Sequence, residues 1–411
     1  MDWSNRFSDK VNVRLEDSAI AVMMNIAARE GALLLAAGEP LEELCPSERL
    51  KKAFEKAHAQ EAHTWGYSQS RTGVFLLRKW IFEWMMSDGL LPDWTSPDNV
   101  FITNGSQEGL ALLTESLHDP GDTVMVESPS YPDAFGVFRK EGLHLAGVDL
   151  LPDGPDVSAM ERLLAERKVK VFYTIPTFQN PTGFTTCHEK KIQILDLARK
   201  HDFLVIEDEP YRDISFDAPQ QGSYVAAAGE DDRVLYMGSF SKTIAPGLRC
   251  GWVVAPQPLV EVLLKLRTAG TLCLPDIVQQ AVYEFVSESD FGEHLKFIRD
   301  AYRKNRDAMV DSLIKHAGPE GLEINIPSGG FFIWGRVPWI KDTEKFVLFA
   351  MKEEKVAAIP GTHFFPVKGE GVDTIRFSFA RVTPEKAEEG AKRMSDALRK
   401  YRMIQEGEST Q

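Results

Sequence analysis

Several short apolar runs of this 411-residue chain are followed directly by residues that could do chemistry. After the run Val234–Met237 comes Lys242, which lies among small hydroxyl residues and is followed seven positions later by Arg249. A lysine in this setting is unusual, although taken alone it is also compatible with a surface lysine in a polar loop. The spacing Ser239-x-x-Lys242 occurs in serine acyl-enzymes as well, but the other motifs of that class are absent.

Carboxylate and amide residues follow two further runs. Three carboxylates in a row, Glu207–Glu209, come after Phe203–Ile206. We expect one of these acids to face a buried site, and the other two to face solvent or to cap the next segment. The sequence Asn180-Pro-Thr-Gly follows Val169–Ile175 and is most simply a turn.

An anion site is predicted where Ser106 and Gln107 open a helix. They follow the run Val100–Ile102, and the free N–H groups in the first turn of a helix can hold a negatively charged group.

The elements that must position these side chains alternate between strand and helix from about residue 99 to residue 255. The predicted strands are residues 100–102, 123–126, 144–148, 169–175, 203–206, 234–237 and 252–254. Amphipathic segments such as Val157–Lys168 and Glu189–Lys200 lie between them. This alternation predicts an α/β fold with a mostly parallel, seven-stranded sheet that is sandwiched by helices. Ligands of such sheets bind at the carboxyl ends of the strands, where the polar residues above lie.

The pattern changes beyond residue 285. A long helix is expected at Phe291–Lys315, and the separated strands and helices that follow predict a smaller α+β domain. The strands are expected around residue 324 and at residues 331–334, 356–359 and 374–379, with helices at residues 343–355 and 384–405. A further helix is predicted at Asp17–Glu30. We therefore expect an N-terminal arm (residues 1–45) that contributes to the small domain, a large domain (46–288) and the small C-terminal domain (289–411).

Four motifs in one order give the chain a resemblance to a known family. They are Ser239-x-Ser-Lys-x-x-x-Pro-Gly-Leu-Arg-x-Gly-Trp, Asn180-Pro-Thr-Gly, Asp208-x-x-Tyr211 and Pro327-x-Gly-Gly-x-Phe-x-Trp334. The chain resembles the class I/II aminotransferases, which are fold-type I enzymes that depend on pyridoxal 5′-phosphate (PLP). The resemblance runs from about Leu33 to Arg399. Within the family it is similar to the subgroup of 2-aminoadipate and aromatic aminotransferases.

The resemblance implies roles around the ring of the cofactor. Lys242 would form a Schiff base with PLP and, once displaced by substrate, move the Cα proton, which requires an amine with a lowered pKa. Asp208 would keep the pyridine nitrogen protonated, so that the ring can accept electrons. Asn180 and Tyr211 would hydrogen-bond the ring oxygen, and Tyr131 would stack on the ring.

The resemblance also implies an anion cradle and a dimer. The phosphate group of the cofactor would be bound by Ser106, Gln107, Ser239, Ser241 and Arg249, because a dianion needs many donors and positive charge. Tyr67 matches a tyrosine that reaches the cofactor of the neighbouring subunit. The active unit is therefore expected to be a homodimer.

For the substrate, the resemblance implies a bidentate cation. Arg376 on the predicted strand 374–379 matches the arginine that binds the α-carboxylate, and Asn180 and the backbone at Gly38 would assist. The expected reaction moves an amino group from an L-amino acid to a 2-oxo acid in a ping-pong cycle.

Two other functions use the same residues. A carbon–sulfur β-lyase or another enzyme acting at Cα would also need Lys242, Asp208 and Arg376, because the reaction depends on which Cα bond is broken. A non-catalytic sensor of PLP or amino acids is the third interpretation, and the apparently complete set of residues speaks against it.

Composition excludes several classes of protein. The formal net charge is −14 and no block of Lys or Arg stands out, which argues against binding of nucleic acid. No apolar run approaches the length of a membrane helix, and no secretion signal is recognisable, so we expect a cytoplasmic protein. The four cysteines, Cys45, Cys187, Cys250 and Cys273, are widely spaced and predict neither a disulfide framework nor a metal site.

Overall fold

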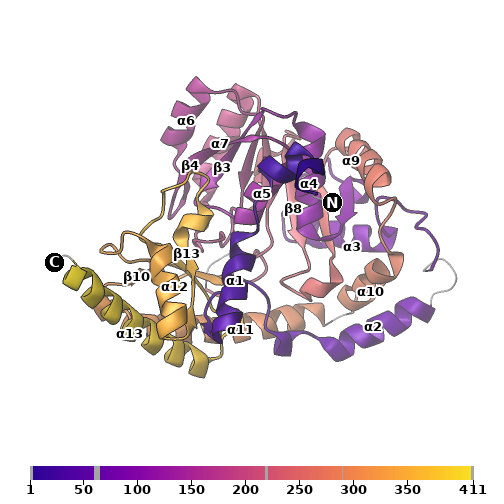
Figure 1. Cartoon of the computed structure of the whole chain (residues 1–411). Helices are drawn as coiled ribbons and strands as arrows, with labels where there is room; N and C mark the ends of the chain where they lie inside the picture. Colours follow the sequence, from indigo (N-terminus) through magenta and orange to yellow (C-terminus); the bar gives the residue numbers. More distant parts are fainter. Residues whose placement is uncertain (1–2, 60–64, 218–220, 289, 409–411) are drawn as a thin grey trace.

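The computed structural model describes residues 3–59, 65–217, 221–288 and 290–408 and contains one large sheet flanked by helices (Figure 1). Its strand order is β2-β9-β8-β7-β6-β3-β4-β5. The strands are β2 (Val100–Thr103), β3 (Thr123–Ser128), β4 (His144–Leu151), β5 (Gly154–Pro155), β6 (Val171–Thr174), β7 (Leu204–Asp208), β8 (Val234–Ser239) and β9 (Gly251–Val254). The five strands from β8 to β4 run parallel, while β9 and β5 run antiparallel to their neighbours.

The predicted α/β architecture is therefore confirmed, and all seven expected strands are present. The predicted count of seven was one short, because β5 joins the edge of the sheet as an eighth strand. With two residues, one of them a proline, β5 is too short to leave a periodic pattern in the sequence.

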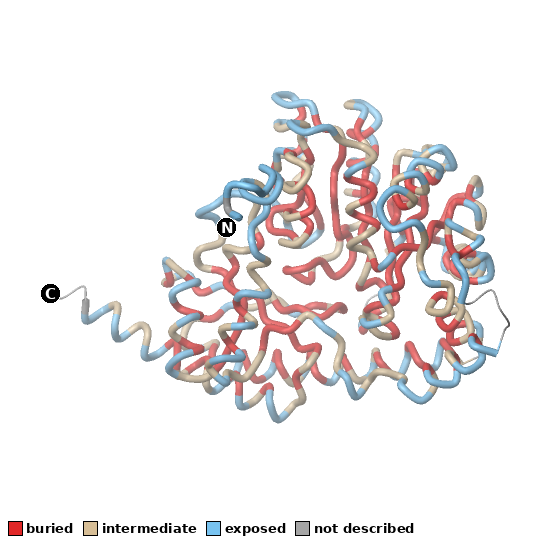
Figure 2. The backbone as a smooth tube through the Cα atoms, turned by 45° about the vertical axis from the view of Figure 1, so that its right-hand side comes forward, coloured by how far each residue is buried: buried red, intermediate tan, exposed pale blue. Residues whose placement is uncertain are grey.

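Helices cover both faces of this sheet, so most residues of its strands are buried. All residues of β2, β6, β8 and β9 are buried. On β9, Trp252 packs against Trp84 of helix α3, whereas Val253 lies close to Gly109 of helix α4. Because successive side chains of a strand point to opposite faces, α3 and α4 lie on opposite sides of the sheet. Figure 2 shows the buried residues gathered in the strands and on the inward sides of the helices.

Helices α1 to α13 lie around the large sheet and two smaller sheets. They are α1 (Ala19–Glu30), α2 (Ser47–Ala59), α3 (Phe75–Ser87), α4 (Gly105–Leu117), α5 (Pro132–Lys140), α6 (Val157–Glu166), α7 (His188–His201), α8 (Tyr224–Ala228), α9 (Gln257–Gly270), α10 (Asp276–Val286), α11 (Phe291–His316), α12 (Thr343–Glu353) and α13 (Pro384–Glu408). In Figure 1, α1 runs between the large sheet and the smaller, C-terminal part of the molecule, and it borders both.

The smaller part is built from both ends of the chain, in agreement with the expected α+β character. An antiparallel sheet joins β10 (Glu323–Ile324), β11 (Phe332–Arg336), β14 (Thr374–Ser378) and β13 (Ile359–Pro360). Near the N-terminus, β1 (Leu33–Leu34) pairs in parallel with β12 (Val356–Ala357). The single strand predicted at residues 356–359 is therefore two short strands that pair with different partners. The predicted domain bounds at residues 1, 289 and 411 lie outside the described residues, and the domain boundaries stay a prediction.

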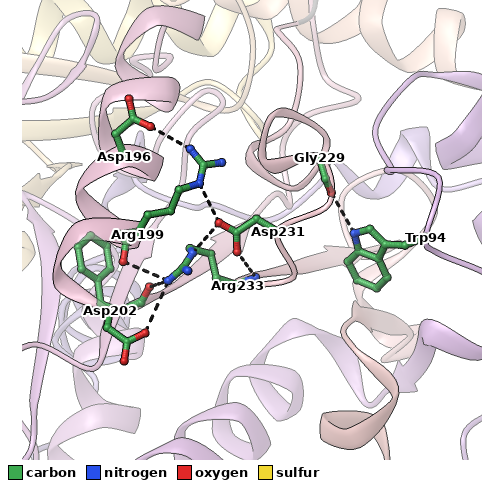
Figure 3. Close-up of polar contacts among 9 residues, drawn as sticks. Trp94, Asp196, Arg199, Asp202, Gly229, Asp231 and Arg233 are labelled. Carbon is green, nitrogen blue, oxygen red and sulfur yellow. Dashed lines mark hydrogen bonds and ion pairs between the residues drawn. The ribbon is translucent and has the colours of Figure 1, made fainter.

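Ion pairs on the outer side of the large sheet join α7 to the segment that leads into β8. The carboxylate of Asp231 accepts hydrogen bonds from Arg199 Nε at 2.9 Å and from Arg233 Nε at 2.7 Å (Figure 3). Arg199 comes from α7, and Arg233 immediately precedes β8. This contact anchors the start of the strand whose other end carries Ser239.

Within the described ranges, no helix is long and apolar enough to cross a membrane. The same residues contain no group of three or more His, Cys, Asp or Glu side chains placed to hold a metal ion.

Candidate active site

A cavity of about 340 Å³ lies at the carboxyl ends of the parallel strands, next to α1 and the small sheet. Every predicted site residue except Tyr67 lines it. These residues are Gly38, Ser106, Gln107, Tyr131, Asn180, Asp208, Tyr211, Ser239, Ser241, Lys242, Arg249 and Arg376. Residues that are as far apart in sequence as Gly38 and Arg376 are thus gathered in one pocket.

The amine of Lys242 points into this pocket from the loop after β8. Its Nζ donates a hydrogen bond to the carbonyl oxygen of Gly38 at 3.0 Å. Burial lowers the pKa of Lys242 to about 8; nearby Glu39 opposes this change, whereas Arg249 and Arg376 add to it. The unprotonated fraction of the amine near neutral pH is therefore much larger than at the ordinary pKa of lysine, and nucleophilic or base chemistry requires this form.

Asp208 ends β7 and reaches the pocket with one oxygen bonded and one free. Its Oδ2 accepts a hydrogen bond from the hydroxyl of Tyr173 at 2.8 Å. Its Oδ1 is buried and has no hydrogen-bond partner in the structure. Burial raises the pKa of Asp208 to about 7, against the opposing effects of Tyr173 and Lys242.

The two acids beside Asp208 are both buried, so the expectation that each would face solvent or cap the next segment holds for only one of them. Glu207 points to the opposite face of the sheet and accepts hydrogen bonds from the backbone N–H groups of Tyr224 at 2.7 Å and Val225 at 3.1 Å. Glu207 thus caps α8, as expected for one of the acids. Glu209 accepts a hydrogen bond from Thr177 Oγ1 at 2.7 Å. Both acids stabilise segments behind the pocket.

A ring of donors forms one end of the pocket. Ser106 and Gln107 lie in the first turn of α4, and the hydroxyl of Ser239 donates to that of Ser241 at 2.9 Å. Arg249 crosses over Gly105, where an added Cβ would lie 2.3 Å from Arg249 Nη2. Gly105 also has a φ of +72°, a backbone conformation that favours glycine. Both the conformation and the close approach of the guanidinium therefore require glycine at this position. Helix N–H groups, hydroxyls and a cation converge here, as an anion requires.

Arg376 lies at the other end of the pocket and is almost completely buried. Its Nη1 donates to Asn180 Oδ1 at 3.0 Å, and its Nη2 donates to the carbonyl oxygen of Ala36 at 2.9 Å. The guanidinium lies over the Phe332 ring, 4.3 Å from its centre, and its Nε has no partner. Although burial lowers the pKa of Arg376 to about 10, the side chain remains charged at neutral pH. Arg376 is therefore a preorganised cation whose Nε–H can still donate a hydrogen bond.

Tyr67 is the one predicted site residue that the structure does not bring to the pocket. Its side chain is 77% exposed on the single chain. Its role at the pocket of a neighbouring subunit therefore stays a prediction.

Sequence reasoning missed several residues of the pocket and one behind it. Ile20 and Met24 of α1, Phe332 of β11 and the acid Glu39 all line the cavity. Tyr173, which contacts Asp208, was treated only as part of an apolar run. A hydroxyl in the middle of a fully buried strand is the signal that could have pointed to it, because such a group needs a partner.

Comparison with known proteins identifies the class of this protein. A model of the family described as "Aminotransferase class I and II" matches residues 30–394. The chain is 32% identical to the aromatic-amino-acid aminotransferase 1 of Thermococcus litoralis, over 97% of this chain and 95% of that protein. It is also 32% identical to the 2-aminoadipate transaminase of Thermus thermophilus, over 97% of this chain and 98% of that protein. The chain therefore belongs to the class I and II aminotransferase family.

A solved structure agrees with this assignment. The alpha-aminoadipate aminotransferase LysN of Thermus thermophilus, complexed with N-(5′-phosphopyridoxyl)-L-leucine, superposes with a TM-score of 0.89 at 31% identity. The match covers 98% of this chain and 100% of that one. The present protein is a PLP-dependent aminotransferase with the fold-type I architecture, and the resemblance recognised in the sequence is confirmed.

The residues of the pocket fit PLP. The unpartnered Oδ1 of Asp208 can accept a hydrogen bond from a protonated ring nitrogen, and the donors around Arg249 can bind a phosphate group. Lys242 lines the same cavity and offers the amine that a covalent bond to the aldehyde of the cofactor needs.

Proposed function

We propose that this aminotransferase transfers the amino group of an L-amino acid with an apolar or aromatic side chain to a 2-oxo acid. The observation that carries the proposal is the composition of the pocket, in which Lys242, Asp208 and Arg376 share one cavity with an apolar wall of Ile20 and Met24. These three side chains would act on the cofactor and on the groups that all amino acids share, the amino group, the Cα proton and the carboxylate. The wall faces whatever side chain the substrate carries.

Side chains of the pocket would contact the phosphate group of PLP, one face of its ring, the ring oxygen and the ring nitrogen. Ser106, Gln107, Ser239, Ser241 and Arg249 would bind its phosphate group. Tyr131 would stack on the ring, while Asn180 and Tyr211 would hydrogen-bond the ring oxygen. The free Oδ1 of Asp208 would accept a hydrogen bond from the protonated ring nitrogen. This second donor would help to keep the buried carboxyl ionised, because burial alone favours its protonated form.

Proton transfer is assigned to Lys242. Bound PLP would supply an electron-withdrawing ring that makes the Cα proton of an attached substrate acidic. Lys242 would accept this proton on Nζ and deliver it to the aldehyde carbon of the cofactor in the same half-reaction. The second half of the cycle would run this transfer in reverse. Burial keeps the pKa of Lys242 close to the working pH, where an amine can both accept and release a proton.

The carboxylate of the substrate would bind Arg376. The guanidinium is already oriented by Asn180, Ala36 and Phe332, so little side-chain freedom is lost when a substrate binds. Its unpartnered Nε is consistent with a further acceptor at this position.

The substrate side chain is inferred from the charges in the pocket. In the described part of the chain, the Lys and Arg residues lining the cavity are Lys242, Arg249 and Arg376, and each has a role above. Among these described residues no further cation lines the cavity to pair with a second carboxylate, and Glu39 and Asp133 would repel one. The leucine conjugate named with the Thermus thermophilus structure shows that an apolar side chain fits that relative's site.

A homodimer in which Tyr67 reaches the neighbouring pocket is the second part of the proposal. Tyr67 and Arg249 are exposed on the single chain, and Trp65 beside Tyr67 is 68% exposed. Exposed aromatic side chains next to each other are typical of surfaces that bury against a partner. A cytoplasmic location also remains a proposal.

The test is a half-reaction followed by absorbance. Purified holoenzyme is mixed with one L-amino acid at a time in the absence of any oxo acid. We expect leucine, methionine and phenylalanine to convert the cofactor to pyridoxamine phosphate faster than glutamate or 2-aminoadipate. Faster conversion by the acidic donors would contradict the proposed side-chain class.

The same experiment separates the other activities considered for the sequence. A carbon–sulfur β-lyase would release pyruvate from a cysteine conjugate without added oxo acid, and a sensor would convert no donor. The relatives named as aminotransferases do not favour either outcome.

A further inference from the structure

A tyrosine on the neighbouring strand holds the carboxylate of Asp208. In the parallel pair β6–β7, Tyr173 lies opposite Ile206. Asp208 is two residues beyond Ile206, so its side chain points to the same face of the sheet as that of Tyr173. A diagonal neighbour at this spacing lies within reach of an aromatic side chain. The hydroxyl of Tyr173 donates to Asp208 Oδ2 at 2.8 Å.

Packing fixes the direction of this hydrogen bond. Tyr173 is completely buried, and its ring meets that of Phe138 of α5 edge-on, with 5.5 Å between the ring centres. Burial raises the pKa of Tyr173 well above its ordinary value, and the negative charge of Asp208 adds to this effect. The hydroxyl therefore keeps its proton and acts as the donor.

Asp208 depends on this donor. Burial raises the pKa of the carboxyl to about 7, and the hydrogen bond from Tyr173 opposes that rise. If Asp208 took up a proton, it could no longer accept one from the ring nitrogen of PLP. The second oxygen, Oδ1, is left without a partner on the protein.

We propose that Tyr173 is a positioning residue that keeps Asp208 ionised and reserves its Oδ1 for the ring nitrogen of PLP. The inference rests on the role proposed above for Asp208. Tyr173 does not line the cavity, so it acts on the cofactor only through the carboxylate.

The test compares the holoenzyme with the variant Tyr173→Phe. Phenylalanine retains the packing against Phe138 and removes only the hydroxyl. We expect PLP to dissociate ~10-fold or more readily, because a hydrogen bond to a charged group is lost. We also expect a lower kcat with an unchanged KM for the amino donor. The acidic limit of the pH profile of cofactor absorbance, where Asp208 takes up a proton, should move to higher pH.

The matched control is Tyr224→Phe. Tyr224 is equally buried in the large domain and does not line the cavity, so this variant reports the general cost of removing a buried hydroxyl. PLP affinity and the pH profile should stay at their wild-type values. Unchanged affinity and an unchanged profile in Tyr173→Phe, or the same changes in both variants, would overturn the proposal.

A double-mutant cycle separates this proposal from the assigned role of Asp208. In an Asp208→Ala background, Tyr173→Phe should cause no further loss of PLP affinity, and an equal loss in both backgrounds would mean that Tyr173 acts by another route. If Asp208→Ala itself leaves binding and turnover intact, the role of Asp208 fails as well.

A second replacement keeps the inference testable if the phenylalanine variant does not fold. Incorporating 3-fluorotyrosine at position 173 retains the hydroxyl and makes it a stronger donor. The acidic limit of the absorbance profile should then move to lower pH. A shift to higher pH, or no shift, would contradict the inference.

Discussion

Burial acts in opposite directions on the two groups at the centre of the site. It lowers the pKa of Lys242 to about 8 and raises that of Asp208 to about 7, since in both cases it disfavours the charged form. For Lys242 this change releases an unprotonated amine. For Asp208 burial favours the protonated form, which could not accept a proton from the ring nitrogen, and hydrogen-bond donors must offset this effect. The burial of the site is therefore useful only together with Tyr173 on one oxygen of Asp208 and a donor on the other.

At the scale of the single residue, Arg376→Ala should raise KM for every α-carboxylate substrate. The arginine is buried, and its loss would leave a substrate carboxylate without its partner. We therefore expect kcat/KM to fall by a factor that corresponds to a loss of ~3–5 kcal/mol in transition-state stabilisation. Steady-state kinetics with leucine measure this. Arg336→Ala is the control, because Arg336 is exposed on the same sheet and pairs only with Asp373 at the surface. An unchanged KM in Arg376→Ala would mean that the carboxylate binds elsewhere.

Helix α1 contributes to the pocket through residues four positions apart, which lie on one side of a helix. Ile20 and Met24 line the cavity, whereas Val22 of the same helix is 39% exposed and does not. Met24→Ala should lower kcat/KM about 10-fold for leucine and phenylalanine, because part of the apolar contact is removed. Activity with alanine, whose side chain ends short of the wall, should be retained.

The control for this prediction is Val22→Ala, which shortens an apolar side chain on the outer side of α1. Its kcat/KM values should equal those of the wild type for all three donors. A uniform loss with leucine, phenylalanine and alanine in Met24→Ala would indicate a shifted helix rather than a lost contact.

The elements also mark how far the sequence alone could lead. The helix expected at Asp17–Glu30 is present as α1, because its apolar spacing and its Ser18 cap are local features. Its place beside the pocket could not be predicted, since this depends on contacts with residues more than 80 positions away. The segment from Ser239 to Arg249 was recognised because the residues of its motif are close together in the sequence. Tyr173 was missed because its partner Asp208 lies on another strand.

At the scale of the whole molecule, several carboxyl groups outside the lining of the pocket have raised pKa values. Burial raises the pKa of Glu127 and Glu207 to about 7 and that of Asp213 to about 6. Each of these groups holds a proton in the folded chain at pH values where the unfolded chain has lost it. The stability that they contribute is therefore complete below their ordinary pKa values and is lost as the pH rises through the raised ones.

Glu127→Gln isolates one of these contributions. Glu127 accepts hydrogen bonds from Thr174, from the Ile175 backbone at 3.3 Å and from Gln179 Nε2 at 3.0 Å, and glutamine occupies the same space without ionising. Any cost of the amide is independent of pH. Between pH 4.5 and 8 the variant should thus gain up to roughly 3 kcal/mol in unfolding free energy relative to the wild type. Urea unfolding of both proteins at matched pH values measures this gain.

The opposite sign is expected at the surface, where Glu388 provides the control. Hydrogen bonds from His316 and Lys392 lower the pKa of this exposed carboxyl to about 2, so its contribution is present above its ordinary pKa and is lost as the pH falls. Glu388→Gln should therefore lose its stability difference from the wild type under acidic conditions. If instead the difference between Glu127→Gln and the wild type is the same at pH 5 and pH 8, Glu127 keeps its charge in the folded chain. The hydrogen bonds from Thr174, Ile175 and Gln179 would then outweigh its burial.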